Sequence, residues 1–169
     1  RQVLGRLPGA KFLVMGFPNV ERYRDRALSL GLGTNVTFTG RVRYEEAPSF
    51  LAAADVAVSP KISVTEANGK LLNYMAVGLP TVAFDTAVNR ELLGELGAFA
   101  RFGDAGDLAA KLVDLLGDDG RRRDLGERLR ARAIEEFSWV GRARRFEEIY
   151  ARLLGGRVEA PADRRSRVA

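Results

Sequence analysis

The residues with the clearest chemical potential in this chain are Asn68, Gly69 and Lys70, which open a short apolar segment from Lys70 to Val77. A glycine turn that leads into a helix leaves amide N–H groups exposed at the helix start, and the helix dipole favours an anion there. Lys70 adds a full positive charge at the same place. Because a buried strand is predicted directly afterwards, from Thr81 to Phe84, this segment predicts a phosphate-binding site.

Short apolar runs alternate with helix-like segments along the rest of the chain. Strands are predicted at Lys11–Met15, Val36–Thr39, Val56–Ser59, Thr81–Phe84 and Ala98–Phe102. Helices are predicted at Val20–Leu30, Glu45–Ala54, Lys70–Val77, Asn89–Leu96, Asp107–Leu116, Gly120–Phe137 and Trp139–Leu154. This alternation predicts an α/β fold with a parallel sheet covered on both faces. Right-handed crossovers make the sheet doubly wound and Rossmann-like.

The predicted sheet brings polar residues together at one edge. Ligands of such sheets bind outside the carboxyl ends of the strands. The loops at that edge carry Gly16, Arg41, Arg43, Glu66, Asn68, Gly69, Lys70 and Asp85. We interpret Asp85 and the nearby Glu91 as structural acids, and the remainder as the lining of a ligand crevice.

The amino-acid composition excludes several kinds of site. The 169 residues are 46% hydrophobic and 29% charged, which is typical of a globular protein. We predict one domain over residues 1–154 and a disordered tail at residues 155–169. The absence of cysteine and histidine excludes disulfides, Cys/His zinc sites and Ser-His-Asp triads within this chain. No apolar run is long enough to cross a bilayer. We expect a cytoplasmic protein.

The net charge of +5 raises the question of a nucleic-acid partner. The arginines at 121–123 alternate with acids such as Asp118, Asp124 and Glu127, which is typical of a solvated helix face laced with ion pairs. We therefore expect no nucleic-acid binding, while an anionic membrane surface stays open as a partner of a longer enzyme.

Seven stretches between Leu4 and Leu154 carry a family resemblance. They are LPGAKFLVMG, NVTFTGRV, FLAAADVAVSP, NGKLLNYMAVGLPTVAFD, NRELLGELG, FGDAGDLAAKLVDLLGD and FSWVGRARRFEEIYARLL. In this order and spacing they resemble the C-terminal, nucleotide-sugar-binding half of a family 4 glycosyltransferase of the GT-B fold. The resemblance implies transfer of a sugar from a nucleoside diphosphate donor, such as a UDP- or GDP-sugar, to an acceptor hydroxyl. It also implies retention of anomeric configuration, no metal and no cofactor.

The resemblance assigns roles to individual residues. The donor diphosphate is expected on the amides of Gly69, Lys70 and Leu71, with Asn68 in the same turn. The nucleobase is expected at Arg41, Val42 and Arg43, and close approach of the donor at Gly16. Arg43 could stack on the base or simply lie exposed, Gly16 could be an ordinary strand-ending turn, and Lys70 an ordinary surface lysine.

Two positions depart from the family pattern. The family carries two glutamates eight positions apart, the first on the donor sugar and the second on the ribose hydroxyls. Asn73 stands at the second position, and Glu66, seven residues earlier, is nearest to the first. Glu66 and Lys70 are the catalytic candidates, and Asn73 the ribose contact. Glu66 could instead be a solvated loop acid.

The resemblance further implies that an acceptor-binding domain precedes Arg1, so that residues 1–169 are N-terminally truncated. Alone they are expected to bind donor weakly and to transfer nothing. One alternative is a non-catalytic nucleotide-binding or interaction module derived from the same fold. A nucleotide-sugar isomerase of the related epimerase group is a further alternative, although those enzymes use histidine, which this chain lacks.

Overall fold

The computed structural model describes residues 1–155 and divides the chain into two compact units, Arg1–Ala133 and Ile134–Ala169. Each unit is considered by itself. The expectation of one domain over residues 1–154 stays a prediction, and the expected disordered tail lies, from residue 156 onward, outside the described residues.

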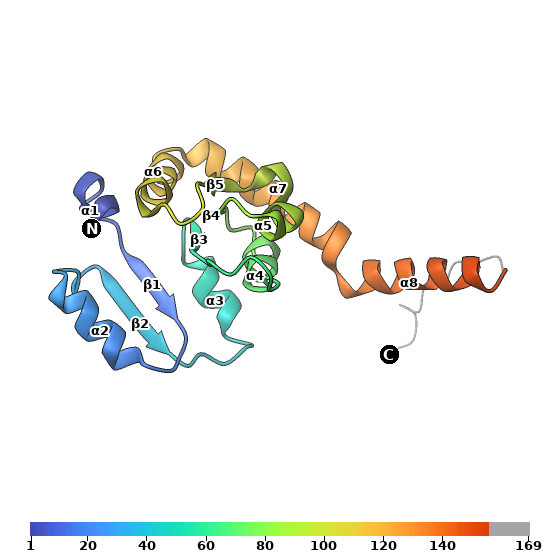
Figure 1. Cartoon of the computed structure of the whole chain (residues 1–169), viewed down its shortest axis with the longest axis horizontal. Coiled ribbons are helices and arrows are strands. Elements are labelled where there is room, and N and C mark those ends of the chain that lie inside the picture. Colours follow the sequence, from blue (N-terminus) through green and yellow to red (C-terminus); the bar gives the residue numbers. More distant parts are fainter. Residues whose placement is uncertain (156–169) are drawn as a thin grey trace, which may run out of the picture. The chain divides into compact units, whose positions relative to one another are not determined.

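The order of elements predicted from the sequence is confirmed from β1 to α8, and a short helix, α1, precedes them (Figure 1). The strands are β1 (Phe12–Met15), β2 (Val36–Gly40), β3 (Ala57–Ser59), β4 (Thr81–Phe84) and β5 (Ala98–Ala100). The helices are α1 (Gln2–Arg6), α2 (Val20–Ser29), α3 (Ala47–Ala52), α4 (Lys70–Ala76), α5 (Ala87–Leu93), α6 (Ala105–Leu116), α7 (Asp119–Phe137) and α8 (Trp139–Leu153), with a 3₁₀ turn at Gly94–Leu96.

Local chemistry sets several of these boundaries. Gly78 takes a positive φ of 72° just after α4, a conformation that glycine adopts without steric cost, so the helix ends there as predicted. The Asp104 carboxylate accepts hydrogen bonds from the amides of Gly106 (2.8 Å) and Asp107 (2.9 Å), which caps α6. The Ser138 hydroxyl accepts from the amide of Gly141 and caps α8.

The five strands of the described residues pair in parallel, as predicted, but they form two sheets instead of one. β1 pairs with β2, and β3, β4 and β5 pair in that order (Figure 1). The continuous sheet expected from the sequence is therefore interrupted between β1 and β3. Each strand can be predicted from its local apolar run, whereas the interruption depends on which strands lie side by side in the folded chain.

Two apolar clusters pack against these strands. The first joins Val3 of α1 to Val82 and Ala98 of the three-stranded sheet and to Leu112 and Leu115 of α6. The second joins Leu51 of α3 to Ala57 and Leu79, with the partly buried Met15, Ala54, Tyr74 and Val77 packed against it.

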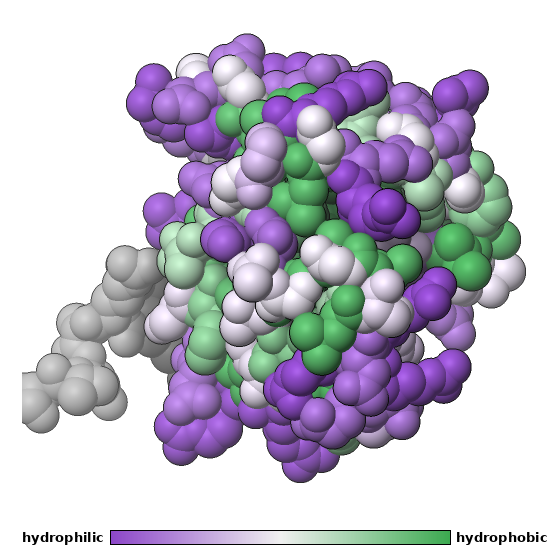
Figure 2. Space-filling model, turned by 90° about the vertical axis from the view of Figure 1, so that its left-hand side faces the viewer, coloured by the Kyte–Doolittle hydropathy of each residue, from purple (hydrophilic) through white to green (hydrophobic). Residues whose placement is uncertain are grey.

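The two sheets differ in how far their strands are buried. All four residues of β4 are buried, as expected for a central strand with helices on both faces. In β1, by contrast, Leu13 is 42% and Val14 43% exposed. The face of the molecule drawn in Figure 2, which is the left-hand side in Figure 1, accordingly carries apolar surface between hydrophilic margins.

Candidate functional site

The loops that follow β1 and β2 meet at the carboxyl edge of their sheet. The amide of Gly16 donates to the carbonyl oxygen of Gly40 (3.0 Å), and Gly16 has a φ of +144°. A Cβ added at Gly16 would meet no atom within 4 Å, so its backbone borders open space. The geometry is compatible with the close approach of a ligand, as predicted for this glycine.

The residues after β2 engage neighbouring side chains. The guanidinium of Arg41 lies 4.0 Å from the ring centre of Phe17, which joins the two loops by a cation–π contact. Arg43 forms an exposed ion pair with Glu46 (2.8 Å), and Val42 between them is half-buried. Arg43 is exposed, which is one of the two alternatives given for it by the sequence analysis.

The loop after β3 is organised by Lys61, a residue that the sequence analysis missed. Its Nζ donates to the carbonyl oxygens of Glu66 (3.1 Å) and Ala67 (2.8 Å), and lies 3.3 Å from the Glu66 carboxylate. Its position directly after the Val56–Ser59 strand segment and Pro60, at the ligand-binding edge, was the available signal. Glu66 itself is exposed and paired to Lys61.

Asn68 lies beneath this loop. It is 2% exposed, and its Nδ2 donates to Ser59 Oγ (2.9 Å) and Asn89 Oδ1 (2.8 Å). Gly69, which follows it, holds the N-cap position of α4, and no side chain caps that helix. Asn68 Oδ1 is buried and accepts no hydrogen bond from the described residues.

Lys70, the first residue of α4, carries a positive charge at the start of that helix. Partial burial lowers the pKa of Lys70, and the nearby charge of Lys61 lowers it further. Within residues 1–155 the amides of Gly69 and Lys70 donate to no atom, whereas the amide of the buried Leu71 donates to the carbonyl oxygen of Asn68 (2.9 Å). Since α4 has only seven residues, its dipole is small beside the charges of the two lysines.

Asn73 is exposed on α4, one turn beyond Gly69. Its side chain makes no hydrogen bond to the described residues, and its carbonyl accepts the amide of Val77. Asn73 is therefore available to a ligand hydroxyl, to which an amide can both donate and accept.

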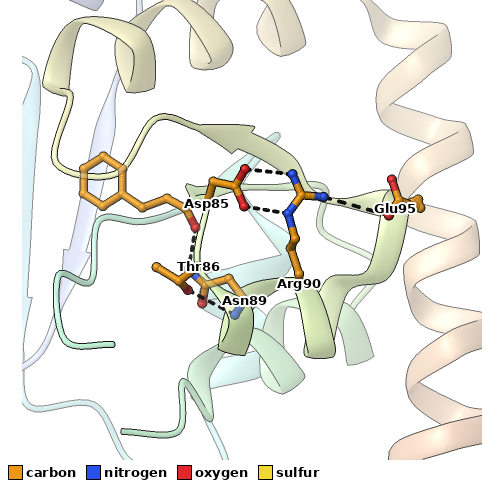
Figure 3. Close-up of polar contacts among 6 residues, drawn as sticks. Asp85, Thr86, Asn89, Arg90 and Glu95 are labelled. Atoms are coloured by element: carbon orange, nitrogen blue, oxygen red, sulfur yellow. Dashed lines mark hydrogen bonds and ion pairs between the residues drawn. The ribbon is translucent and has the colours of Figure 1, made fainter. Parts of the chain in front are cut away.

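Asp85, interpreted as structural, is held by Arg90 (Figure 3). Arg90 donates from Nε to one carboxylate oxygen (2.6 Å) and from Nη2 to the other (2.7 Å). These hydrogen bonds hold the pKa of Asp85 below its usual value. Asn89, beside them, donates from Nδ2 to the carbonyl oxygen of Phe84 (2.8 Å) and so ties α5 to the end of β4.

The predicted residues thus form two groups. Gly16 and the residues at 41–43 belong to the β1–β2 edge, and the residues from Glu66 to Asn73 belong to the β3–β4–β5 edge. No hydrogen bond or ion pair joins the two groups in the described part of the chain. Among those same residues, no three His, Cys, Asp or Glu side chains cluster as metal ligands would. None of the described helices combines the length and apolarity needed to span a bilayer.

Residues 1–118 match the family model of the glycosyl transferases group 1. The chain belongs to this family. The match includes both groups of site residues, from Gly16 to Asn73, and ends just after α6.

The names of two relatives in the family indicate that they transfer different sugars. The chain is 30% identical over 145 residues to a GDP-mannose-dependent monoacylated alpha-(1-6)-phosphatidylinositol monomannoside mannosyltransferase of Corynebacterium glutamicum, covering 82% of this chain and 38% of that protein. It is 31% identical over 119 residues to a 2-deoxystreptamine N-acetyl-D-glucosaminyltransferase of Streptomyces fradiae, covering 69% of this chain and 28% of that one. The chain spans about two fifths or less of the length of these relatives.

Several solved structures share this fold, including the following two. Sucrose-phosphate synthase from Thermosynechococcus elongatus is 25% identical with a TM-score of 0.77, over 90% of this chain and 41% of that one. HepE of Anabaena, solved in complex with UDP, is 20% identical with a TM-score of 0.77, over 89% of this chain and 44% of that one. The α/β fold with parallel sheets, expected from the resemblance, is thereby confirmed.

Proposed function

We propose that this chain is the donor-binding part of a retaining glycosyltransferase, which transfers a sugar from a nucleoside diphosphate sugar to an acceptor hydroxyl. The observation that carries the proposal is the pair of lysines at the carboxyl edge of β3. Lys61 and Lys70 lie close enough for one charge to lower the pKa of the other, in a family of sugar-transferring enzymes. Two cations placed together in this way favour a multiply charged anion such as a diphosphate.

The relatives support a nucleotide sugar as the donor. One is GDP-mannose-dependent by name, and a protein of the same fold was solved with UDP. Because these nucleotides differ, the base used by this chain is decided by its own loops. In the proposal the base lies beside Arg41, Val42 and Arg43, and the backbone of Gly16 borders the donor.

Catalysis in this proposal is positioning combined with electrostatic stabilisation of the departing diphosphate. Lys70 and the open amides of Gly69 and Lys70 hold the phosphates. Glu66 contacts the donor sugar, and Asn73 the ribose. No metal or cofactor takes part. In this proposal the acceptor binds to another domain. We further propose that the enzyme works in the cytoplasm, binds no nucleic acid and has a membrane surface as a partner of its longer form.

Calorimetric titration with UDP, GDP, ADP and their glucose or mannose conjugates tests this function. We expect saturable binding of one nucleotide. The Lys70→Ala variant should weaken that binding about 10- to 100-fold, since a hydrogen bond to a charged group contributes about 1.5–3 kcal/mol. Lys111→Ala, on α6 and outside the site, serves as the matched control and should leave binding unchanged. Turnover of a nucleotide sugar by residues 1–169 alone would contradict the proposal that they form only the donor-binding part.

The alternative is a non-catalytic binding module derived from this fold. Asn73, in place of the family's glutamate, and the short loop at Glu66 favour it. The two functions separate in the longer protein, because a competent enzyme should transfer sugar from its nucleotide donor, whereas the module should transfer none even where it binds the nucleotide.

A further inference from the structure

Phe17 and Arg41 hold matching places just beyond the ends of two paired strands. β1 and β2 run parallel, and Met15 at the end of β1 lies opposite Gly40 at the end of β2 (Figure 1). Phe17 follows Gly16 directly, and Arg41 follows Gly40. Both of these glycines have a positive φ, of 144° and 71°. The two strand ends therefore bring one aromatic ring and one guanidinium to the same part of the ligand-binding edge.

The ring and the guanidinium are in contact and exposed. The guanidinium carbon of Arg41 lies 4.0 Å from the ring centre of Phe17, whose side chain is 56% exposed. Arg41 is exposed as well, and it makes no hydrogen bond or ion pair with another described residue. Its neighbour Arg43, by contrast, is paired with Glu46. The charge of Arg41 is therefore not neutralised by a carboxylate, while the ring restricts where the guanidinium lies.

The backbone beside this pair leaves open space. A Cβ added at Gly16 would meet no atom within 4 Å. A Cβ added at Gly40 would first meet Val20 Cγ2, at 4.0 Å. A planar group of a ligand can therefore approach the pair without displacing the main chain.

A guanidinium held on one ring is suited to receive a second ring. The guanidinium is planar, and only one of its two faces lies on Phe17. Nucleobases stack on the guanidinium plane of arginine in nucleic-acid recognition. An arginine already held on a ring has also lost part of its rotamer freedom before the ligand binds, so that ordering it on binding costs less.

We propose that Arg41 stacks its open face on the nucleobase of the donor, and that Phe17 is the positioning residue that holds the guanidinium in place. The order of the stack is Phe17, Arg41, base. The inference rests on the proposed function, because that function supplies the nucleotide. Every base has a π-face, so the stack adds affinity while hydrogen bonds along the base edge choose between bases.

Calorimetric titration of residues 1–169 with UDP, GDP and ADP tests the proposal on the nucleotide that binds. Phe17→Leu should weaken binding about two- to fivefold, which is the effect of losing one exposed cation–π contact, and Phe17→Tyr should restore it. Arg41→Lys keeps the charge but has no planar face, so it should weaken binding at least about fivefold. Phe102→Leu is the matched control, because Phe102 is similarly exposed (51%) and follows β5. It should leave binding unchanged.

A double variant separates positioning from direct contact. If Phe17 acts only through Arg41, Phe17→Leu should have no further effect once Arg41→Lys is present. An equal loss in both backgrounds would overturn the positioning role, since the ring would then contact the nucleotide itself or merely support its loop. Nucleotide binding that is the same in Phe17→Leu and wild type would overturn it as well.

The stacked pair can also be measured without a ligand. The ring current of Phe17 should shift the NMR resonances of the Arg41 side-chain protons, and Phe17→Leu should abolish that shift. Unshifted resonances in the wild type would overturn this inference even where a nucleotide binds, and would leave the proposed function standing. Shifted resonances without binding of any of the three nucleotides would instead contradict the proposed function, and base stacking with it.

Discussion

At the scale of the residue, the acidic side chains near the candidate site are paired, whereas one of its lysines is not. Asp85 is neutralised by a bidentate pair with Arg90, and the carboxylate of Glu66 is paired with Lys61. Lys70 has no ion-pair partner among the described residues, and both partial burial and Lys61 lower its pKa. Its charge is therefore available to a ligand and costs folding free energy while no ligand is bound.

Lys70→Gln should make the ligand-free chain more stable at neutral pH. The folded pKa of Lys70 lies below its unfolded value of 10.5. Between these two values the unfolded chain binds more protons, so wild-type stability rises with pH through that window. The variant should lose this rise while gaining stability below the window. Urea unfolding from pH 7 upward measures both effects, with Lys111→Gln as the control. Equal stability of variant and wild type at every pH would contradict this assignment.

Asp85 should also make stability rise with pH, but in the acidic range. Its folded pKa lies below the usual value of 3.8, because Arg90 hydrogen-bonds to it. The stabilisation is therefore present above pH 3.8 and is lost as pH falls through the folded pKa. Asp85→Asn should be less stable than wild type at neutral pH, and the difference should shrink on acidification. Thermal unfolding between pH 7 and pH 2 checks this; a constant difference would show that the carboxylate charge is not responsible.

At the scale of the element, one buried hydrogen-bond network joins three segments. Asn68 links Ser59 at the end of β3 to Asn89 of α5, and Asn89 holds the carbonyl oxygen at the end of β4. The network fixes the loop that carries Lys61 and Lys70 to the sheet below it.

Asn68→Ala should lower the free energy of unfolding by about 1–3 kcal/mol, because it leaves Ser59 and Asn89 buried without their partner. The exposed Asn73→Ala change should stay within about 0.5 kcal/mol. Denaturant unfolding of the two variants makes the comparison. A similar small effect in both would mean that the Asn68 network adds nothing to stability.

Helix α7 approaches the turn after α4 through a glycine. A Cβ at Gly126 would lie 2.3 Å from the carbonyl oxygen of Gly78, a backbone atom that cannot turn aside. Gly126→Ala should destabilise the first unit by about 1–3 kcal/mol, despite the better helix propensity of alanine. Gly120→Ala, in the same helix with its nearest atom at 3.6 Å, should instead be neutral or stabilising by up to about 1 kcal/mol. Stability gained in both variants would refute the close approach.

At the scale of the whole molecule, sequence predicts the elements better than their pairing. Apolar runs and glycine turns are local, so the strand at Thr81–Phe84 and the end of α4 at Gly78 could be predicted. The separation of β1 from β3 depends on non-local pairing and could not. Likewise the loop after β3 was predicted as part of the site, but the inward side chain of Asn68 and the role of Lys61 depend on the path of that loop in three dimensions.

The central claim is that the loops at the carboxyl ends of β1, β2 and β3 bind one nucleotide donor. The most direct test is to follow the backbone amide resonances of residues 1–169 while UDP, GDP or ADP is added. We predict saturable shifts for one nucleotide, concentrated at Gly16, Arg41, Gly69 and Lys70 and reduced in Lys70→Ala. The account would be contradicted if no nucleotide moved these amides at millimolar concentration, or if the shifts gathered away from the loops that follow β1, β2 and β3.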